Sequence, residues 1–445
     1  MTIKIKEEKD VLLINPLLHP IEFETPLGML YLATVLAENF CGAKILDFAF
    51  EKNYSKLKKE LKVKDYKVVG IYSMSGFYTS AEKVAKMVKK LCPETFLIIG
   101  GPHATIFPEE ILQNKLVDGV VIGEGEKALP KIIDAIKKKK NFENINNFYY
   151  KKQNNIIKSR KESLEIKNIP IPNRYLLDNL EQYKFSKEKM FGYKALNMIA
   201  SRGCPFTCEF CQPMLQSMFG TKTKLRNPRE IIKEIYQLKS RYGVEAIWFS
   251  DDTFTFDKNW VHDICKEIIK QKIEIKWSCN SRVDTVDEKL LKHMAKAGCI
   301  QIRYGVESGS DIISQGSLGK KITAKKTRKA FALADKYKIN TWAYTMLGGP
   351  EETEETFEET KKLLREIKPV HIQLTITTPL PGTYYYKNLD KMDITLRRKP
   401  FGKVDLFRDS ITDSKKLSHK KIKRMYKGFR KEFKQYYLER IKHEI

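Results

Sequence analysis

The strongest constraint on the fold is an alternation of short apolar runs with amphipathic helical segments, which recurs in two separate blocks. The first block spans residues 10–138, and its pattern is typical of βαβ units that share a parallel sheet. Residues 1–138 are therefore predicted to form a Rossmann-like, doubly wound domain with ligands at the carboxyl ends of its strands. The expected strands are Val11–Asn15, Ala43–Asp47, Val68–Tyr72, Phe96–Gly100 and Gly119–Ile122, and the expected helices include Leu27–Glu38, Ala81–Leu91 and Glu109–Asn114.

The second block, residues 191–388, has the same alternation over six expected strands. Successive βα units of this kind are typical of a partial (β/α)6 TIM-type barrel, whose functional residues lie at the carboxyl ends of the strands. A second doubly wound sheet is the alternative that the pattern leaves open. The expected strands are Leu196–Ser201, Ala246–Ser250, Ile275–Asn280, Ile300–Val306, Thr341–Leu347 and His371–Thr377, and the expected helices are Pro228–Tyr242, Trp260–Gln271, Asp287–Lys296, Ala324–Tyr337 and Thr353–Ile367.

Two further segments complete the α/β organisation. Residues 139–190 are interpreted as a linker that includes a hairpin, Phe148–Lys152 and Ile156–Arg160, joined by Gln153–Asn155. Residues 389–445 are predicted to form a basic helical C-terminal region. Within it, residues 415–445 hold 12 Lys and Arg against 3 Asp and Glu, which accounts for a third of the net charge of the chain.

Charge and cysteine content exclude several classes of protein. The chain has 82 Lys and Arg against 55 Asp and Glu, a net charge of +27, which favours an anionic partner. No uncharged apolar stretch is long enough to span a membrane. Eight cysteines are too few for a disulfide scaffold, so we expect a cytoplasmic protein. Aromatic residues at helical spacing in the basic C-terminal region would permit peripheral membrane contact, and nucleic acid is the less favoured partner.

Three of the cysteines form the motif Cys204-x3-Cys208-x2-Cys211, directly after the first expected strand of the second block. Zinc normally takes four ligands, and no nearby His or fourth Cys completes such a set. Thiolates also bind iron–sulfur clusters, and three of them would leave one iron of a four-iron cluster open. The motif therefore predicts a cluster with an open coordination site. The remaining cysteines are interpreted as core residues: Cys41, Cys92, Cys265, Cys279 and Cys299.

This motif, with aromatic Phe210 before its last cysteine, resembles that of the radical S-adenosylmethionine (SAM) superfamily. The resemblance covers residues 191–388, and segments 249–254, 303–310, 346–352 and 378–383 are similar to motifs of these enzymes. It implies that the three cysteines hold a [4Fe-4S] cluster whose open iron is chelated by SAM. Reductive cleavage of SAM there would yield a 5′-deoxyadenosyl radical, with the electron supplied by an external donor such as ferredoxin or flavodoxin.

The resemblance also implies a set of SAM-binding residues. The backbone of Phe210 would lie near the adenine, and Ser250 and Asp251 near the methionine amino group. Arg282 would donate to the methionine carboxylate, and Glu307 would bind the ribose hydroxyls. A surface ion pair between Arg282 and Asp284 is the structural alternative to this role.

Residues 10–138 resemble the cobalamin-binding domain that precedes the radical domain in class B radical SAM methyltransferases. The matching stretches are 26–33, 100–105 and 121–126. No DxHxxG motif, the usual source of the lower cobalt ligand, is present, and His103 is not assigned as an axial ligand. The resemblance implies cobalamin-binding residues at Ser73, Ser75, Gly100, Gly101, Gly123 and Glu124.

Together these resemblances predict cobalamin-dependent methylation of an unactivated carbon in a small-molecule, lipid or peptide substrate. The alternative is a radical SAM cyclisation, rearrangement or oxidation, with a first domain that does not methylate and need not bind cobalamin. A methylthiotransferase is disfavoured because those relatives have a second cysteine triad in the first domain, where this chain has only Cys41 and Cys92. An RNA-binding protein with a structural cluster is a third hypothesis, prompted by the net charge.

Overall fold

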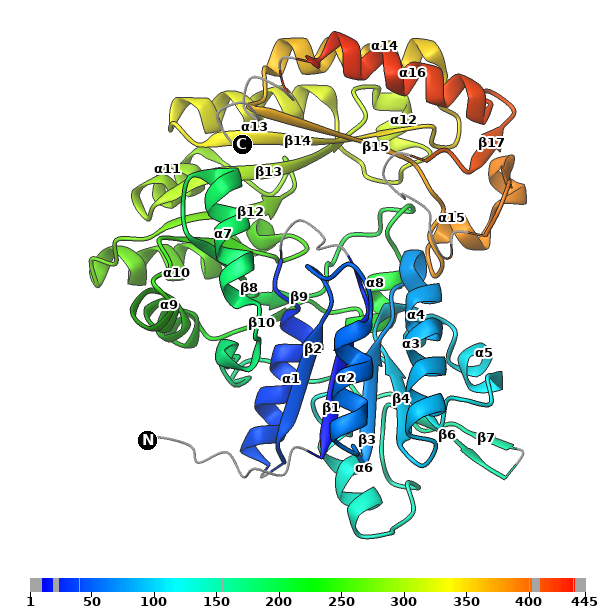
Figure 1. The fold of residues 1–445 in the computed structure, drawn as a ribbon. Helices are drawn as coiled ribbons and strands as arrows, with labels where there is room; N and C mark the ends of the chain where they lie inside the picture. Colours follow the sequence, from blue (N-terminus) through cyan, green and yellow to red (C-terminus); the bar gives the residue numbers. More distant parts are fainter. Residues whose placement is uncertain are drawn as a thin grey trace. The chain divides into compact units, whose positions relative to one another are not determined.

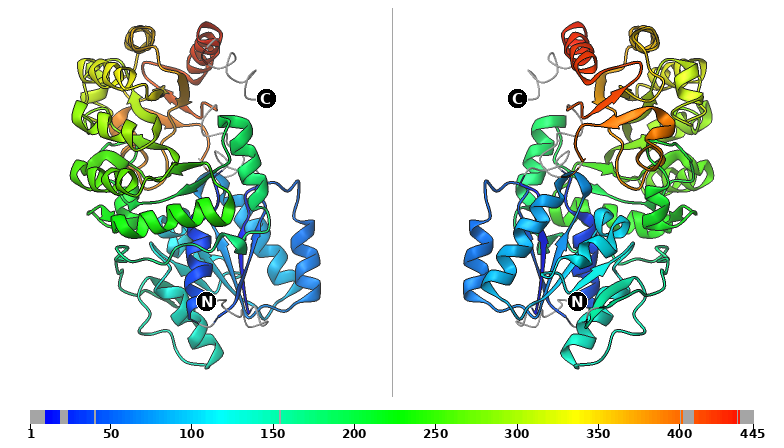
Figure 2. Two further views of the ribbon diagram at one scale, coloured as in Figure 1. Left: turned by 90° about the vertical axis from the view of Figure 1, so that its left-hand side faces the viewer. Right: turned by 90° about the vertical axis from the view of Figure 1, so that its right-hand side faces the viewer.

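The computed structural model describes residues 10–18, 24–39, 41–153, 155–399, 401, 409–434 and 436 (Figures 1 and 2). The chain divides into two compact units. Unit 1 comprises Met1–Tyr183, Ser217–Gly220 and Phe401–Lys403, and unit 2 comprises Lys184–Gln216, Thr221–Pro400 and Val404–Ile445.

Unit 1 contains a seven-stranded sheet in the order β2-β1-β3-β4-β5-β6-β7. The first five strands are parallel, and the order reverses at β1, as in doubly wound folds whose ligands bind at that switch point. The predicted Rossmann-like sheet is therefore confirmed, with four of its strands at the expected bounds. The strands are β1 (Val11–Asn15), β2 (Ala43–Asp47), β3 (Val68–Tyr72), β4 (Phe96–Gly100), β5 (Gly119–Val121), β6 (Phe148–Lys152) and β7 (Asn155–Ile157).

Helices cover this sheet and bury its strands. Every residue of β1 is buried, as expected for a strand between two helical layers. The strand residues pack with apolar faces of the helices into one core. The helices of unit 1 are α1 (Leu27–Glu38), α2 (Ser55–Val63), α3 (Tyr78–Leu91), α4 (Pro102–Ile106), α5 (Pro108–Gln113) and α6 (Ala128–Lys137).

The hairpin expected in the linker belongs to this sheet. β6 pairs antiparallel with β5, and β7 pairs with β6, so the hairpin extends the sheet beyond its parallel part. The second hairpin strand ends at Ile157, three residues earlier than the pattern indicates.

Unit 2 contains a six-stranded parallel sheet in the order β15-β14-β13-β12-β11-β8. This order follows the chain without reversal, and right-handed crossovers then place every connecting helix on one face. A doubly wound sheet reverses its order, so the partial barrel is confirmed and the alternative is wrong. The strands are β8 (Ala195–Met198), β11 (Ala246–Phe249), β12 (Lys276–Ser281), β13 (Cys299–Glu307), β14 (Asn340–Leu347) and β15 (His371–Ile376).

Helices flank this sheet on its outer side (Figure 1). The local signals for α9 are typical: Asn227 caps its N-terminus by accepting from the Arg229 N–H at 3.0 Å, and Gly243 ends it in a left-handed conformation. The main helices of unit 2 are α9 (Pro228–Tyr242), α10 (Lys258–Lys270), α11 (Glu288–Lys296), α13 (Ala324–Lys336) and α14 (Glu354–Ile367). Shorter helices are η3 (Phe254–Phe256), α8 (Met214–Phe219), α12 (Asp311–Gln315) and α15 (Tyr384–Lys387), and α7 (Leu180–Phe191) precedes the first strand.

The C-terminal region begins with a small antiparallel pair, β16 (Ile394–Leu396) and β17 (Thr412–Ser414), followed by α16 (His419–Glu432). The helix predicted there is confirmed as far as the structure describes it, and residues 437–445 lie outside the described part. Its apolar face packs on the barrel through Phe429, whose ring centroid lies 5.7 Å from that of Phe357 on α14. Among the described residues, we find no helix with the length and apolar character needed to cross a membrane.

Candidate functional site

The cysteine motif lies on the loop that follows β9 (Ser201–Arg202). The backbone N–H groups of Cys211 and Gln212 both donate to the carbonyl of Cys208, at 3.1 and 2.8 Å, which closes a tight turn. Contacts at both ends of this turn anchor it, because Glu209 N–H donates to Leu318 at 3.1 Å and Tyr384 N–H donates to Gln212 at 2.7 Å. The loop is therefore held by segments that follow β13 and β15.

The three thiols lie close enough to influence one another. Burial raises the pKa of the Cys208 thiol, and the positive charges of Lys320 and Arg282 oppose that rise. Burial also raises the pKa of Cys211, with further contributions from a nearby carboxylate and from the charges of Cys204 and Cys208. Deprotonating Cys208 and Cys211 is thus unfavourable unless a metal centre neutralises their sulfurs.

The donor set fits an iron–sulfur cluster better than a single ion. Among the described residues, no three Cys, His, Asp or Glu side chains converge on one metal position. Three thiolates that each bind a different iron of a cubic cluster need not converge on one point. Cys204 and Cys211 are partly exposed and Cys208 is buried, and these three thiols would hold the cluster.

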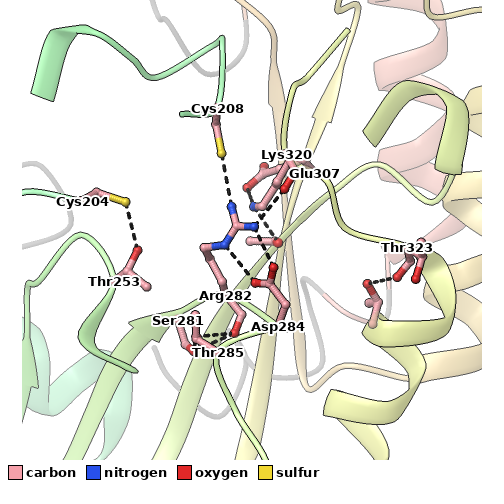
Figure 3. A network of polar contacts seen from close by, with 12 residues as sticks. Cys204, Cys208, Thr253, Ser281, Arg282, Asp284, Thr285, Glu307, Lys320 and Thr323 are labelled. Carbon is pink, nitrogen blue, oxygen red and sulfur yellow. Dashed lines mark hydrogen bonds and ion pairs between the residues drawn. The ribbon is translucent and has the colours of Figure 1, made fainter. Parts of the chain in front are cut away.

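Arg282, which follows β12, contacts the cysteine loop directly (Figure 3). Its Nη1 donates to Cys208 Sγ at 3.3 Å, and its Nε and Nη2 donate to the two carboxylate oxygens of Asp284, each at 2.9 Å. Nη2 also donates to the carbonyl of Lys320 at 2.9 Å. Arg282 was expected to bind a SAM carboxylate, and the structure places its donors on groups of the chain itself.

Glu307 ends β13 in a left-handed conformation with φ of 60°, which is uncommon for a residue with a side chain. The register of β13 against β14 shifts between Gly305 and Glu307, and this irregularity turns the carboxylate toward Lys320. Lys320 Nζ donates to Glu307 Oε1 at 2.7 Å and to the Gly305 carbonyl at 2.8 Å. Backbone strain of this kind is typical of functional sites.

The carboxylate of Asp251 is buried and faces the backbone before the cysteine loop. It accepts from the Ala200 N–H at 3.1 and 3.2 Å and from Ser201 Oγ. Burial raises the pKa of Asp251 to about 7, although these hydrogen bonds lower it. The residue expected to lie near the SAM amino group therefore joins the end of β11 to the segment that follows β8.

Three buried polar atoms at the strand ends have no hydrogen-bond partner in the described part of the chain. They are Ser250 Oγ after β11, Asn280 Oδ1 near the end of β12, and Thr377 Oγ1 after β15. Buried polar groups in folded proteins usually have a partner, which can be protein, water or a ligand. The set fits a polar ligand such as SAM, and Phe210, expected near its adenine, packs its ring against the cluster of Ile313, Leu318 and Tyr385.

Sequence reasoning assigned no role to Lys320, Asn280 or Glu352, although Glu352 lies in the motif segment 346–352 and Asn280 ends an expected strand. Glu352 is buried at the end of the β14 loop and accepts from the Gly348 N–H. Burial raises its pKa to about 7, and the hydrogen bonds from the glycine backbone oppose the rise. A carboxylate three residues after a Gly-Gly pair is the sequence signal that could have identified it.

In unit 1, the residues expected to bind cobalamin lie at the end of β4 and on the segments that follow β3, β4 and β5. Ser73 Oγ donates to the Gly100 carbonyl at 2.9 Å, and Ser75 Oγ lies 3.0 Å from His103 Nδ1. Gly101 has φ of 100°, and a Cβ there would lie 2.7 Å from the Ser73 carbonyl oxygen. The first two loops are thus closely packed on each other.

The remaining loop, after β5, faces a different part of unit 1. Gly123 has φ of 63°, and its N–H donates to Thr105 Oγ1 at 2.8 Å. Glu124 is buried, and its Oε2 accepts from the Leu164 N–H at 3.0 Å. The Glu124 carboxylate therefore supports residues after the hairpin.

Two observations bear on a cobalamin site at this sheet. Asn15 ends β1, next to the switch point, and its buried Oδ1 has no hydrogen-bond partner among the described residues, which fits a ligand with amide donors. His103 is buried against Tyr78, with ring centroids 4.1 Å apart, and burial lowers its pKa to about 4. Within unit 1 the His103 side chain is held by the Tyr78 ring and by Ser75 Oγ, which lies 3.0 Å from its Nδ1.

Comparison with known families matches two models to this chain. The model described as the Radical SAM superfamily matches residues 198–364, and the B12 binding domain matches residues 21–133. An uncharacterized methyltransferase of Pyrococcus horikoshii is 32% identical over 93% of this chain and 88% of its own length. An anaerobic magnesium-protoporphyrin IX monomethyl ester cyclase of Rubrivivax gelatinosus is 27% identical over 74% of this chain and 59% of its own.

Among solved structures, the fold is similar to that of the radical SAM methyltransferase TsrM from Kitasatospora setae, determined with cobalamin and a [4Fe-4S] cluster bound. The TM-score is 0.74 with 15% identity, and the match covers 94% of this chain and 81% of that chain. At this identity the likeness concerns the fold, and it extends through both α/β units.

Proposed function

Because this chain belongs to the radical SAM superfamily, among the members with a B12-binding domain, we propose that it methylates an unactivated carbon with the aid of cobalamin. The observation that carries the proposal is that one chain contains both a cysteine motif for a cluster and a sheet that matches the B12-binding domain. Unit 2 presents three thiols at the carboxyl ends of barrel strands, and unit 1 presents the switch point of a sheet that matches the B12-binding domain.

Residues of unit 2 hold the cofactors in this proposal. Cys204, Cys208 and Cys211 bind the [4Fe-4S] cluster, while Ser250 and Asn280 accept hydrogen bonds from SAM through the atoms that now have no partner. Glu307, oriented by its ion pair to Lys320, binds the SAM hydroxyls. When bound, the cluster and SAM supply one-electron chemistry that activates a C–H bond, and cobalamin supplies the methyl group.

In unit 1, the closely packed loops after β3 and β4 form the support for cobalamin, with Asn15 as an acceptor beside the switch point. The substrate is a small molecule, lipid or peptide, and a ferredoxin or flavodoxin supplies the electron. A radical cyclisation is the second candidate, because relatives named as ester cyclases match 74% of this chain.

The cluster is tested by anaerobic purification and reconstitution of the full chain. We expect about four irons per chain, iron–sulfur absorbance, and 5′-deoxyadenosine after addition of SAM and dithionite. The variant Cys208→Ala should lose all three signals. Cys265→Ala, a buried cysteine of α10, is the matched control and should keep them. An iron-free wild-type protein would contradict the proposal.

A titration with hydroxocobalamin separates the two candidates. Methylation requires a bound corrinoid and predicts S-adenosylhomocysteine among the products of SAM. A protein that forms 5′-deoxyadenosine but retains no corrinoid after gel filtration would favour the cyclisation candidate and exclude cobalamin-dependent methylation.

A further inference from the structure

We propose that Arg282 is a positioning residue for the iron–sulfur cluster. Arg282 acts by donating a hydrogen bond to the sulfur of Cys208. This role differs from the SAM-carboxylate role implied by the family resemblance. It rests on the proposed function, because it requires that Cys208 bind iron. Its consequence is that Arg282 sets the reduction potential and the retention of the cluster.

The guanidinium is fixed on every side by groups of unit 2. Asp284 accepts from it in a bidentate arrangement, the Lys320 carbonyl accepts a third N–H, and Cys208 Sγ accepts a fourth at 3.3 Å. The Phe206 ring lies against its face, 3.8 Å from the guanidinium carbon. Four of its roughly five donors are thus engaged, so a two-pronged contact to a SAM carboxylate would have to displace either Asp284 or the Lys320 carbonyl.

Burial makes this hydrogen bond a strong one. The side chain of Arg282 is 8% exposed and Cys208 is buried, so water competes little for either group. A donor that carries a charge forms hydrogen bonds about twice as strong as a neutral donor does. The rigidity conferred by Asp284 and Phe206 also lowers the entropic cost of aiming the guanidinium at the sulfur.

Lys320 is the second cation beside Cys208, and its position differs in one decisive respect. Its ammonium donates to Glu307 and to the Gly305 carbonyl, and its charge reaches the thiol without a hydrogen bond to it. Lys320 therefore contributes a field, while Arg282 contributes both a field and a directed bond. Figure 3 shows Arg282, paired with Asp284, below the sulfur of Cys208, with the pair of Lys320 and Glu307 to the right of it.

The physical effect on a bound cluster follows from its charge. Adding an electron makes the cluster and its sulfur ligands more negative, so a cationic donor on one sulfur stabilises the reduced form more than the oxidised form. Hydrogen bonds to the sulfurs are among the factors that set the potentials of such clusters. Loss of Arg282 should therefore make the cluster harder to reduce and easier to lose.

The test is an anaerobic redox titration of the reconstituted full chain, with dithionite as reductant, no SAM present, and electron paramagnetic resonance as readout. For Arg282→Met we expect the ratio of reduced to oxidised cluster at a given potential to fall about tenfold, a shift of about 59 mV for one electron. Arg282→Lys keeps the charge but loses the directed bond, so its shift should be smaller in the same direction. Arg328→Met removes an exposed arginine of α13 and should leave the potential unchanged.

Retention provides a second readout. Iron release to a chelator should be faster for Arg282→Met than for wild type, because outer-shell partners typically change metal affinity by about 10- to 100-fold. If Arg282→Met does not fold, as judged by circular dichroism, the titration of Arg282→Lys decides the outcome. The affinity for SAM is also measured, by equilibrium dialysis, for wild type and both Arg282 variants.

The outcomes separate this inference from the proposed function. Equal potentials in wild type and both Arg282 variants would refute the inference while the cluster itself stands. An unchanged potential together with weaker SAM binding would assign Arg282 to the SAM carboxylate instead. A wild-type protein that binds no cluster would refute the proposed function, and the inference with it.

Discussion

Replacing Asp251 with asparagine is expected to shift the stability of the full chain increasingly in favour of the variant as the pH rises from 5 to 7.5. The carboxylate is 1% exposed and lies against the Ala200 N–H and Ser201 Oγ. Burial raises its pKa from 3.8 to about 7. Asparagine has nearly the same shape, can still accept from the Ala200 N–H, and carries no charge to bury.

The magnitude follows from the two pKa values of Asp251. Between pH 3.8 and about 7 the folded chain retains a proton that the unfolded chain has lost, so the stability contributed by this group falls as pH rises. One pH unit corresponds to about 1.4 kcal/mol, so the two units from pH 5 to 7 amount to about 3 kcal/mol as an upper value. For a domain of this size, that is a melting-temperature difference of about 6–12 °C.

The assay compares melting temperatures of wild type and Asp251→Asn in the full chain at pH 5 and pH 7.5. The gap, which is the melting temperature of Asp251→Asn minus that of wild type, should increase by several degrees from pH 5 to pH 7.5. Glu352, whose pKa is also raised to about 7, titrates in both proteins and cancels from the gap. A gap that is constant with pH would refute the reasoning. SAM affinity at pH 7.5 is the companion measurement, and a tenfold loss with a constant gap would show that the carboxylate serves SAM.

Two further substitutions test the support of each unit. Gly101→Ala should lower the melting temperature and weaken corrinoid retention. The backbone at residue 101 has φ of 100°, and an alanine Cβ would lie 2.7 Å from the Ser73 carbonyl oxygen, which together cost about 1–3 kcal/mol. An unchanged melting temperature would contradict this prediction. Arg226→Met should destabilise unit 2 by about 3–5 kcal/mol, since it leaves the fully buried Glu234 carboxylate without the ion pair at 2.6 Å. Adding Glu234→Leu should restore most of the loss, and a double variant that melts no higher than the single one would contradict this explanation.

Periodicity predicts individual strands well here because most of them lie between a helical layer and another layer of the core. β1 to β4 end where the apolar runs end, and α9 begins at the expected Pro228, since its cap and its Pro are local signals. Strand order is not local. The reversal at β1 and the antiparallel addition of β6 depend on which edge each strand meets, and a single sequence does not encode that choice in its pattern.

In the site, too, the sequence predicts where residues lie along the strands but does not predict which groups they contact. The sequence places Asp251 and Glu307 at strand ends, where parallel sheets bind ligands, and the structure has them there. It does not show that Asp251 turns to the backbone of Ala200, or that Glu307 adopts a left-handed conformation to meet Lys320. Lys320 follows a glycine in a lysine-rich loop, which in sequence is indistinguishable from an exposed turn.

Arg282 shows why a motif can locate a residue and still leave its role open. Its carboxylate partner, Asp284, is two residues away and visible in the sequence, but an exposed pair would leave the arginine free to exchange partners with a ligand. Burial restricts that freedom, because detaching the guanidinium would leave the desolvated charge of Arg282 without its ion-pair partner. Cys208 lies 74 residues earlier and reaches the guanidinium only because the cysteine loop is anchored to the segment after β13. The role of Arg282 therefore follows from the packing of three loops, and the potential of the cluster is the measurement that is sensitive to it.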